Sequence, residues 1–312
     1  MDLCLMIEGQ EGVTWPQWQA LAAACEQHGI PALFRSDHYL NILGQRLGVG
    51  ALDAWGTINA LAAQTTTLRL GTLVSPASFR HPSVLAKLVV TADQVSGGRI
   101  ELGIGAGWFD REHEAYGFPF APTSVRMDVL QEQLQILLGT WGSEPFSFDG
   151  EHYVLSDLEA EPKPVQKPHP PVIMGGSGGP RSAALAARFA DEYNTPFPSL
   201  DEIRERRGRI AEACERAGRQ PIPFSIMSSM ILGADAAELS ERARRMGEIL
   251  GVDADALLRE PPQGWTVGTL EQAAAQLATV RDAGVSRVMA QLRAHDDLDA
   301  VALIGRLAAE LA

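Results

Sequence analysis

Two short polar segments contain the residues best suited to chemistry. Ser36-Asp37-His38-Tyr39 follows an apolar, strand-like segment, and Glu8 ends the first such segment of the chain. The imidazole of His38 could donate or accept a proton near neutral pH, and Asp37 could tune it or accept a hydrogen bond from a cofactor N–H group. Glu8 and Asp37 could also act as an acid–base pair. The alternative is a polar strand end that caps a helix.

A glycine loop, Gly175-Gly176-Ser177-Gly178-Gly179, is the second candidate site, and a helix is predicted to begin after it at Pro180. Free backbone N–H groups and the helix dipole make such a junction suitable for a phosphate. Arg181 places a positive charge in the first turn, where the dipole disfavours it, so it could meet an anion. The alternative is a flexible turn with Arg181 in solvent. The spacing matches neither a Walker loop nor a dinucleotide fingerprint.

A third candidate is the end of the predicted strand 99–105. Its residues alternate, and one face becomes nearly bare before Gly105-Ala106-Gly107. Glycine in a strand usually marks the close approach of a ligand or of another part of the backbone. Trp108 follows directly and is a candidate for the wall of an apolar pocket.

These residues need elements that bring them together. Strand-like and helix-like segments alternate along the whole chain, which predicts a parallel sheet covered by helices. Eight such units in 312 residues favour a closed (β/α)8 TIM barrel over a doubly wound open sheet. The site would then lie at the carboxyl ends of the strands. The predicted strands are 3–8, 32–37, 68–74, 99–105, 171–176, 191–196, 224–232 and 287–292.

One connection is too long for a simple barrel loop. Residues 106–170 separate the fourth and fifth strands and contain a predicted helix at 125–141 and a hairpin turn at Asp149-Gly150. We expect a single domain over 1–312, with 106–170 as an insertion that forms a lid or a binding element. Residues 233–266, after the seventh strand, are a second candidate for shaping specificity.

Composition excludes several functional classes. The net charge of −13 and the lack of a basic cluster argue against nucleic-acid binding; the richest run, 204–209, alternates with Glu and is predicted to be a surface helix. We find no stretch long and apolar enough for a membrane span. Three scattered cysteines fit a reducing cytoplasm. The histidines and cysteines form no metal-ligand pattern, so no metal is expected.

The segment 93–117, DQVSGGRIELGIGAGWFDREHEAYG, together with 34–39, 68–82 and 162–179, resembles the bacterial luciferase-like monooxygenase superfamily. More narrowly, these segments resemble its oxidoreductases that depend on the deazaflavin coenzyme F420. The resemblance covers essentially the whole chain and implies the same barrel fold. It also implies a homodimer, a small-molecule substrate and, in some members, a separate reductase that supplies reduced cofactor.

The resemblance further implies where the cofactor would lie. A flat ring would rest against the ends of the third and fourth strands and touch Gly105-Ala106-Gly107. A non-proline cis peptide would form a bulge under the ring within Leu73-Val74-Ser75. Asp37 would stand beside the ring, and the phosphate and tail would reach Gly175, Gly176, Ser177 and Gly178. Basic residues available for an anionic tail are Arg80, Lys163, Lys167 and Arg181.

The chemistry implied by the resemblance is hydride transfer between F420 and a C=C, C=N, C=O or alcohol group. His38 or Glu8 would move the accompanying proton, Asp37 would assist, and Trp108 and Tyr39 would line the substrate pocket. Two alternatives stay open. One is a reduced-FMN-dependent monooxygenase, and the other is a protein that binds a flavin or deazaflavin without turnover. The sequence does not identify the substrate.

Overall fold

The structure is a computed structural model that describes residues 1–42 and 49–311. Within these residues, eight parallel strands close into a barrel, because β1 pairs with β12 and β9 pairs with β10. Each predicted barrel strand is present, with ends that differ by one or two residues. The strands are β1 (Asp2–Ile7), β2 (Ala32–Arg35), β3 (Arg69–Thr72), β5 (Ile100–Gly105), β8 (Val172–Gly175), β9 (Glu192–Pro196), β10 (Phe224–Gly233) and β12 (Arg287–Gln291).

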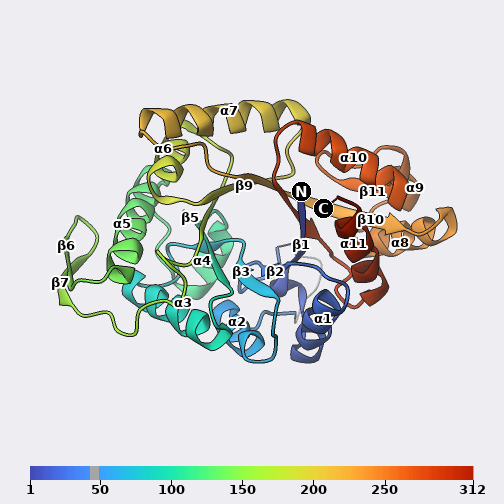
Figure 1. Ribbon diagram of the computed structural model, residues 1–312. Coiled ribbons are helices and arrows are strands. Elements are labelled where there is room, and N and C mark those ends of the chain that lie inside the picture. The colour runs from blue at the N-terminus through green and yellow to red at the C-terminus, as the bar shows by residue number, and fades with distance from the viewer. Residues whose placement is uncertain (43–48, 312) are drawn as a thin grey trace.

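Helices surround the barrel (Figure 1) and follow the strands in the order that a TIM barrel requires. Pro180 begins α6, as predicted. None of the helices in the described part of the chain combines the length and apolar composition that a bilayer crossing needs. The surrounding helices are α1 (Trp15–Gln27), α2 (Ala54–Ala62), α3 (Pro82–Ser96), α5 (Thr123–Trp141), α6 (Pro180–Phe189), α7 (Leu200–Arg216), α10 (Leu270–Asp282) and α11 (Leu298–Leu311).

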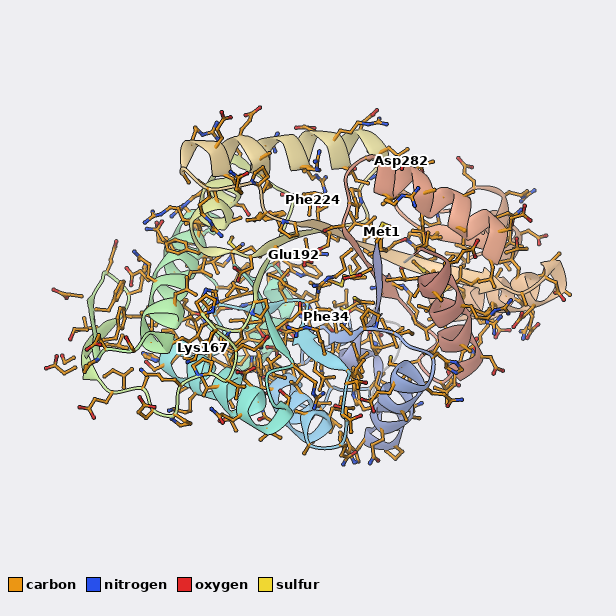
Figure 2. All side chains as sticks on the ribbon, viewed as in Figure 1. Met1, Phe34, Lys167, Glu192, Phe224 and Asp282 are labelled. Atoms are coloured by element: carbon orange, nitrogen blue, oxygen red, sulfur yellow. The ribbon has the colours of Figure 1, made fainter. Side chains whose placement is uncertain are left out.

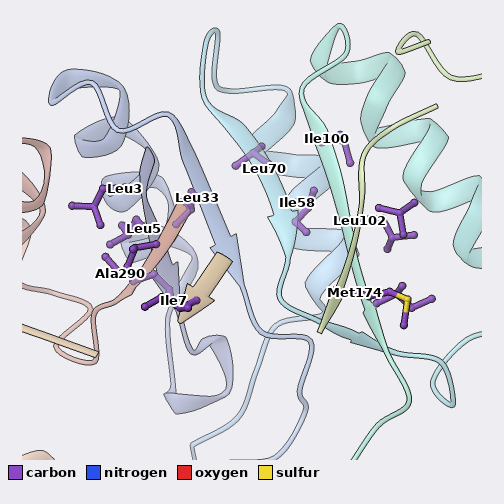
Figure 3. Packing of buried hydrophobic residues seen from close by; sticks show 14 of the residues in the cluster. Leu3, Leu5, Ile7, Leu33, Ile58, Leu70, Ile100, Leu102, Met174 and Ala290 are labelled. Carbon is purple, nitrogen blue, oxygen red and sulfur yellow. The ribbon is translucent and has the colours of Figure 1, made fainter. Parts of the chain in front are cut away.

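Strand alternation separates two apolar cores. Leu3, Leu5 and Ile7 of β1 belong to the large core between the strands and the helices (Figure 3), whereas Cys4 and Met6 belong to a smaller cluster inside the barrel. The same alternation of inward and outward side chains continues past the end of β1. It directs the next even-numbered residue, Glu8, toward the barrel mouth.

A charged network fills the amino end of the barrel. The carboxylate of Glu101 lies 2.5 Å from Arg69 Nε and 2.7 Å from Arg287 Nη1, and Arg287 Nη2 lies 3.3 Å from Glu192. Phe34 and Glu192 both lie inside the ring of strands (Figure 2). Burial raises the pKa of Glu192 to about 7, although the nearby Arg287 opposes this shift.

The segment 106–170 only partly forms an insertion. It contains α4 (Asp110–Tyr116), α5 and the predicted hairpin of β6 (Phe146–Asp149) and β7 (Val154–Leu158). Helix α5 packs between α3 and α6 and takes the place of the fourth barrel helix. The hairpin lies outside the helical ring, beyond α5 (Figure 1). It therefore does not cover the barrel mouth, and α4 is the extra element that reaches the strand ends.

A second excursion follows β10. It contains α8 (Ala236–Leu250), α9 (Ala254–Arg259) and β11 (Thr266–Thr269). Strand β11 pairs with the last four residues of β10, outside the barrel, and was not predicted. Its sequence, TVGT, holds a single apolar side chain, so it lacks the apolar run that marks other four-residue strands such as β2 and β8.

Candidate active site

A cavity of about 510 Å³ opens at the carboxyl ends of the strands. This volume lies in the range of small-molecule sites, and most of the wall is apolar. Many of the predicted site residues contribute to it. Those that line the cavity are Glu8, His38, Val74, Gly105, Ala106, Gly107, Trp108, Gly175, Gly176 and Ser177.

The glycine-bearing face of β5 packs against part of the protein's own backbone. The Leu73–Val74 peptide is cis, at the place that the resemblance implied, and β4 (Ser75–Pro76) resumes pairing with β5 beyond it. A Cβ added to Gly105 or Gly175 would lie 2.9 Å from a methyl group of Val74, and one added to Gly103 would lie 2.0 Å from the Thr72 carbonyl oxygen. The glycines therefore accommodate the bulge, and Val74 forms the cavity floor.

His38 is held by a carboxylate that sequence reasoning missed. Its Nδ1 lies 2.8 Å from Oε2 of Glu112, a fully buried residue of α4. The other oxygen of Glu112 accepts hydrogen bonds from the backbone N–H groups of Tyr39 and Leu40, the latter at 2.9 Å. Glu112 lies within the segment that carries the family resemblance, but nothing in the spacing links it to His38, 74 residues away.

This contact sets the charge of the pair. Burial by itself would lower the pKa of His38, but the hydrogen bond and the negative charge of Glu112 outweigh it, and the pKa is raised. Burial would raise the pKa of Glu112, yet the hydrogen bond from His38 and the two backbone N–H groups lower it. The geometry favours a proton on Nδ1, which leaves Nε2 to exchange a proton with a substrate.

Asp37 does not reach the cavity, which corrects its assignment to catalysis and to cofactor contact. The residue is wholly buried. Its Oδ2 accepts hydrogen bonds from Ser75 Oγ at 2.6 Å and from Arg80 Nη1 at 2.5 Å. Ser75 is likewise buried and accepts a hydrogen bond from Trp55 Nε1 at 3.1 Å. Asp37 and Ser75 thus hold the chain in place beneath Val74. Arg80, which is distant from Asp37 in the sequence, neutralises the Asp37 carboxylate.

Glu8 lies on the cavity wall, and amide groups hold both of its oxygens. Oε1 accepts a hydrogen bond from Gln291 Nε2 at 2.6 Å, and Oε2 accepts one from Gln10 Nε2 at 2.8 Å. Its negative charge also contributes to the raised pKa of His38. Glu8 and His38 therefore remain the two titratable candidates of the original set that face the cavity.

The side chains of Trp108 and Tyr39 point in different directions. Trp108 lines the cavity, meets the His38 ring edge-on at 5.7 Å and is 61% exposed at the rim. Tyr39 turns away, and its hydroxyl donates a hydrogen bond to Asp53 Oδ2 at 3.0 Å and accepts one from Arg80 at 3.0 Å. The pocket assignment of Tyr39 is thus corrected, because Asp53 and Arg80 draw its hydroxyl outward.

The glycine loop has a fixed conformation. The Gly176 N–H donates to the Asn194 carbonyl at 3.0 Å, and the Gly178 N–H donates to the Tyr193 hydroxyl at 2.9 Å. Gly178 has a φ of 68°, a left-handed conformation that favours glycine. Ser177 lines the cavity beside this anchored backbone. Two N–H groups that a phosphate could have used are therefore already engaged within the protein.

Three of the four expected cations are engaged by groups outside the loop, and the role expected of Lys167 stays a prediction. Arg181 donates to the Ser124 carbonyl at 2.9 Å and pairs with Asp128 on α5, Arg80 pairs with Asp37, and Lys163 donates to the Thr140 carbonyl at 3.2 Å. Two other arginines, both in the run 204–209 on α7, lie closer. Arg209 Nη1 donates to the Gly178 carbonyl at 2.6 Å, and Arg206 packs against Gly178. Their i, i+3 spacing on one helix face was the available signal.

No group of three or more His, Cys, Asp or Glu side chains is placed to hold a metal ion among residues 1–42 and 49–311. The chemistry that the cavity offers consists of proton transfer by His38 or Glu8, beside an apolar floor that suits a flat ring.

Comparisons with known proteins agree with the family resemblance of the sequence. A family model described as luciferase-like monooxygenase matches residues 5–307. An FMNH(2)-dependent dimethylsulfone monooxygenase of Pseudomonas putida is 36% identical over 147 residues, which are 47% of this chain and 40% of that enzyme. An F420-dependent glucose-6-phosphate dehydrogenase of Amycolatopsis mediterranei is 25% identical over 303 residues, 88% of each chain. The chain therefore spans well under half of the first relative and most of the second.

Solved structures share the fold. A monooxygenase from Streptomyces bottropensis superposes with a TM-score of 0.81 at 22% identity, over 99% of this chain and 98% of that one. An F420-dependent secondary alcohol dehydrogenase superposes with a TM-score of 0.81 at 18% identity, over 98% of each chain. At these identities the likeness establishes the barrel architecture alone.

Proposed function

Because this chain belongs to the luciferase-like monooxygenase family, we propose that it transfers a hydride between coenzyme F420 and a small organic substrate. The observation that carries the proposal is the His38–Glu112 pair on the cavity wall. Hydride transfer to or from an oxygen- or nitrogen-bearing carbon needs a proton donor or acceptor at the same place. The Amycolatopsis dehydrogenase, which aligns over 88% of each chain, is F420-dependent.

The residues present fit a flat, amphipathic ring. Val74 offers an apolar floor, Met127 and Met227 add apolar walls, and the Gly176-Ser177 backbone forms one edge of the cavity. When bound, a deazaflavin supplies or accepts a hydride and does not readily activate oxygen. Arg206 and Arg209 contact Gly178 and would place positive charge beside the loop near the cofactor's anionic part, although each also pairs with a glutamate of α7.

The chain's own groups would then control the proton. In the oxidation of an alcohol, Nε2 of His38 accepts the hydroxyl proton as the carbon loses its hydride. In the reverse reduction, the same nitrogen returns that proton to the carbonyl oxygen. Glu112 stabilises the imidazolium that forms in between, because its carboxylate stays ionised. Trp108 shields one side of the imidazole from water.

A second candidate function is that of a reduced-FMN-dependent monooxygenase. The observation that favours it is the stretch of 147 residues that is 36% identical to the FMNH(2)-dependent dimethylsulfone monooxygenase. In that case a separate reductase would supply the reduced flavin. A homodimer is expected under either function.

A titration distinguishes the two. Purified apo-protein is titrated separately with oxidised F420 and with FMN, and cofactor and protein fluorescence are followed. Binding of F420 at least about a hundredfold tighter than that of FMN supports hydride transfer, and assays then use alcohols, ketones and imines with F420 absorbance as the readout. A preference for FMN would refute the proposal in favour of oxygenation, and oxygen consumption with a flavin reductase would be measured instead.

A further inference from the structure

Arg293 continues the row of side chains that β12 directs into the barrel. Met289 belongs to the cluster inside the barrel, and Gln291 and Arg293, two and four residues further, line the cavity together with His38. A cation therefore stands in a largely apolar cavity, on the wall that also carries Glu8.

The guanidinium of Arg293 has no hydrogen-bond or ion-pair partner among the residues that the structure describes. Its Nε is buried and unsatisfied, and the Trp265 ring, whose centroid lies 5.9 Å from Cζ, engages none of the N–H groups. Other arginines of the barrel differ. Arg35 donates to Thr57 Oγ1 at 2.7 Å, and Arg287 pairs with Glu101 at 2.7 Å. A buried N–H without a partner is unfavourable, and the half-buried Nη groups face the cavity, so this position is poised for a ligand.

The neighbouring carboxylates do not satisfy the N–H donors of Arg293. Burial lowers the pKa of Arg293, and the nearby carboxylates of Glu8 and Glu11 only partly oppose this shift. Both oxygens of Glu8, however, accept amide hydrogen bonds, and Glu11 accepts one from the Ile42 N–H at 3.3 Å. The two carboxylates keep this wall negative, so an anion would be held here only through direct contact with the guanidinium.

We propose that the substrate carries an anionic group, a carboxylate, sulfonate or phosphate, which Arg293 binds at the β12 side of the cavity. The planar fork of N–H donors in a guanidinium matches such oxyanions. Binding there would hold the rest of the substrate across the cavity, toward His38. This inference rests on the proposed function for its reacting centre, but the binding step stands on Arg293 alone. The cofactor's own phosphate or carboxylate is the other possible source of the anion.

The test measures binding without turnover. Protein saturated with whichever of F420 or FMN it prefers is titrated by calorimetry with hexanesulfonate, hexanoate and neutral hexan-1-ol. The variants are Arg293→Met, Arg293→Lys and the control Arg204→Met, which removes an exposed cation that is paired with Asp201 on α7, away from the residues that line this cavity. Because the readout is affinity, a preference for FMN would refute the proposed function and leave this test intact.

The wild type is expected to bind the two anions at least about tenfold more tightly than hexan-1-ol. Arg293→Met should lose that preference, Arg293→Lys should keep part of it, and Arg204→Met should keep all of it. Anion affinity that is unchanged in Arg293→Met would overturn the proposal. So would a tenfold loss of cofactor affinity with the anion preference intact, because Arg293 would then serve the cofactor.

Thermal unfolding separates a ligand-binding role from a structural one. Because Arg293 has no hydrogen-bonded partner to lose, Arg293→Met should leave the Tm unchanged or raise it. A Tm that falls by several degrees in both Arg293→Met and Arg293→Lys would show that the guanidinium supports the fold, and would also overturn the proposal.

Discussion

Nδ1 of His38 and Oε2 of Glu112 lie 2.8 Å apart, although the two residues come from the end of β2 and from α4. The contact joins the strand end to the helix that covers it, so the position of the proposed proton-transfer group depends on the first part of the segment 106–170. It also orients the imidazole, since only Nε2 is left to meet a substrate.

Replacing His38 by Ala should lower kcat by about 10²–10⁴-fold and change the cofactor Kd by less than about twofold. The imidazole moves the proton, whereas Val74 and the glycine loop would hold the cofactor. Steady-state rates and a fluorescence titration of the same preparation check this. Added imidazole should restore part of the rate, because the substitution leaves space at the cavity wall. An unchanged kcat would remove His38 from the reaction.

Glu112→Gln should lower the pKa of His38, because the carboxylate is what raises it. A raised folded-state pKa stabilises the protein fully below the unfolded value of about 6.5, and the stabilisation disappears as the pH rises through the folded value. The variant should therefore lose most stability between about pH 4.5 and 6.5, where Glu112 is ionised and His38 is protonated. NMR titration of the His38 ring checks the shift. Glu114→Gln, an exposed change on the same helix, should leave it in place.

Asp37→Asn should destabilise the protein by about 3 kcal/mol, because it leaves the Arg80 guanidinium without its buried carboxylate. Denaturant unfolding measures the change. As a control, Asp201→Asn breaks an exposed pair with Arg204 and should change stability by less than about 1 kcal/mol. If Asp37→Asn kept wild-type stability and lost only turnover, the result would show that Asp37 takes part in the reaction.

Gly176→Val should weaken cofactor binding by at least about tenfold. An added Cβ would lie 3.0 Å from the Tyr193 hydroxyl, so the loop that borders the cavity would have to move. Gly179→Ala is the matched control, because a Cβ there meets nothing within 4 Å. Equal affinities for the two variants in the fluorescence titration would argue against a cofactor at this loop.

Glu192→Gln should remove a pH dependence from stability. The pKa of Glu192 is about 7 in the fold against 4.5 for the unfolded reference, so the folded protein holds a proton that the unfolded chain releases. Wild-type stability should therefore fall as the pH rises from about 4.5 to 7, by up to about 3 kcal/mol. Melting curves across this range should show the slope in the wild type and in the exposed variant Glu215→Gln. The same slope in Glu192→Gln would contradict the assignment.

The barrel was predictable because period-two alternation is a local property. Ile100, Leu102 and Ile104 share one face of β5, as the alternation indicates, and belong to the core between strands and helices, whereas β11 was missed because TVGT holds a single apolar side chain. The site was predictable where side chains simply follow a strand, as Glu8 and His38 do. It was not predictable where a partner decides the orientation.

Asp37, Tyr39 and Arg181 illustrate this limit of local reasoning. Each has a suitable side chain next to the cavity. Each is turned away by a charged group that is distant in the chain: Arg80 for Asp37, Asp53 for Tyr39 and Asp128 for Arg181. The spacing along a sequence carries no information about such pairs.

The contact of Val74 with Gly105 and Gly175 has a consequence for how this scaffold can diversify. A side chain at Gly105 or Gly175 would collide with Val74, so these two positions can vary only if Val74 changes with them. New substrate ranges must then arise from the opposite half of the mouth, where β1, β2 and β12 end. A combinatorial library confined to that half should retain folded members far more often than one spread around the whole rim.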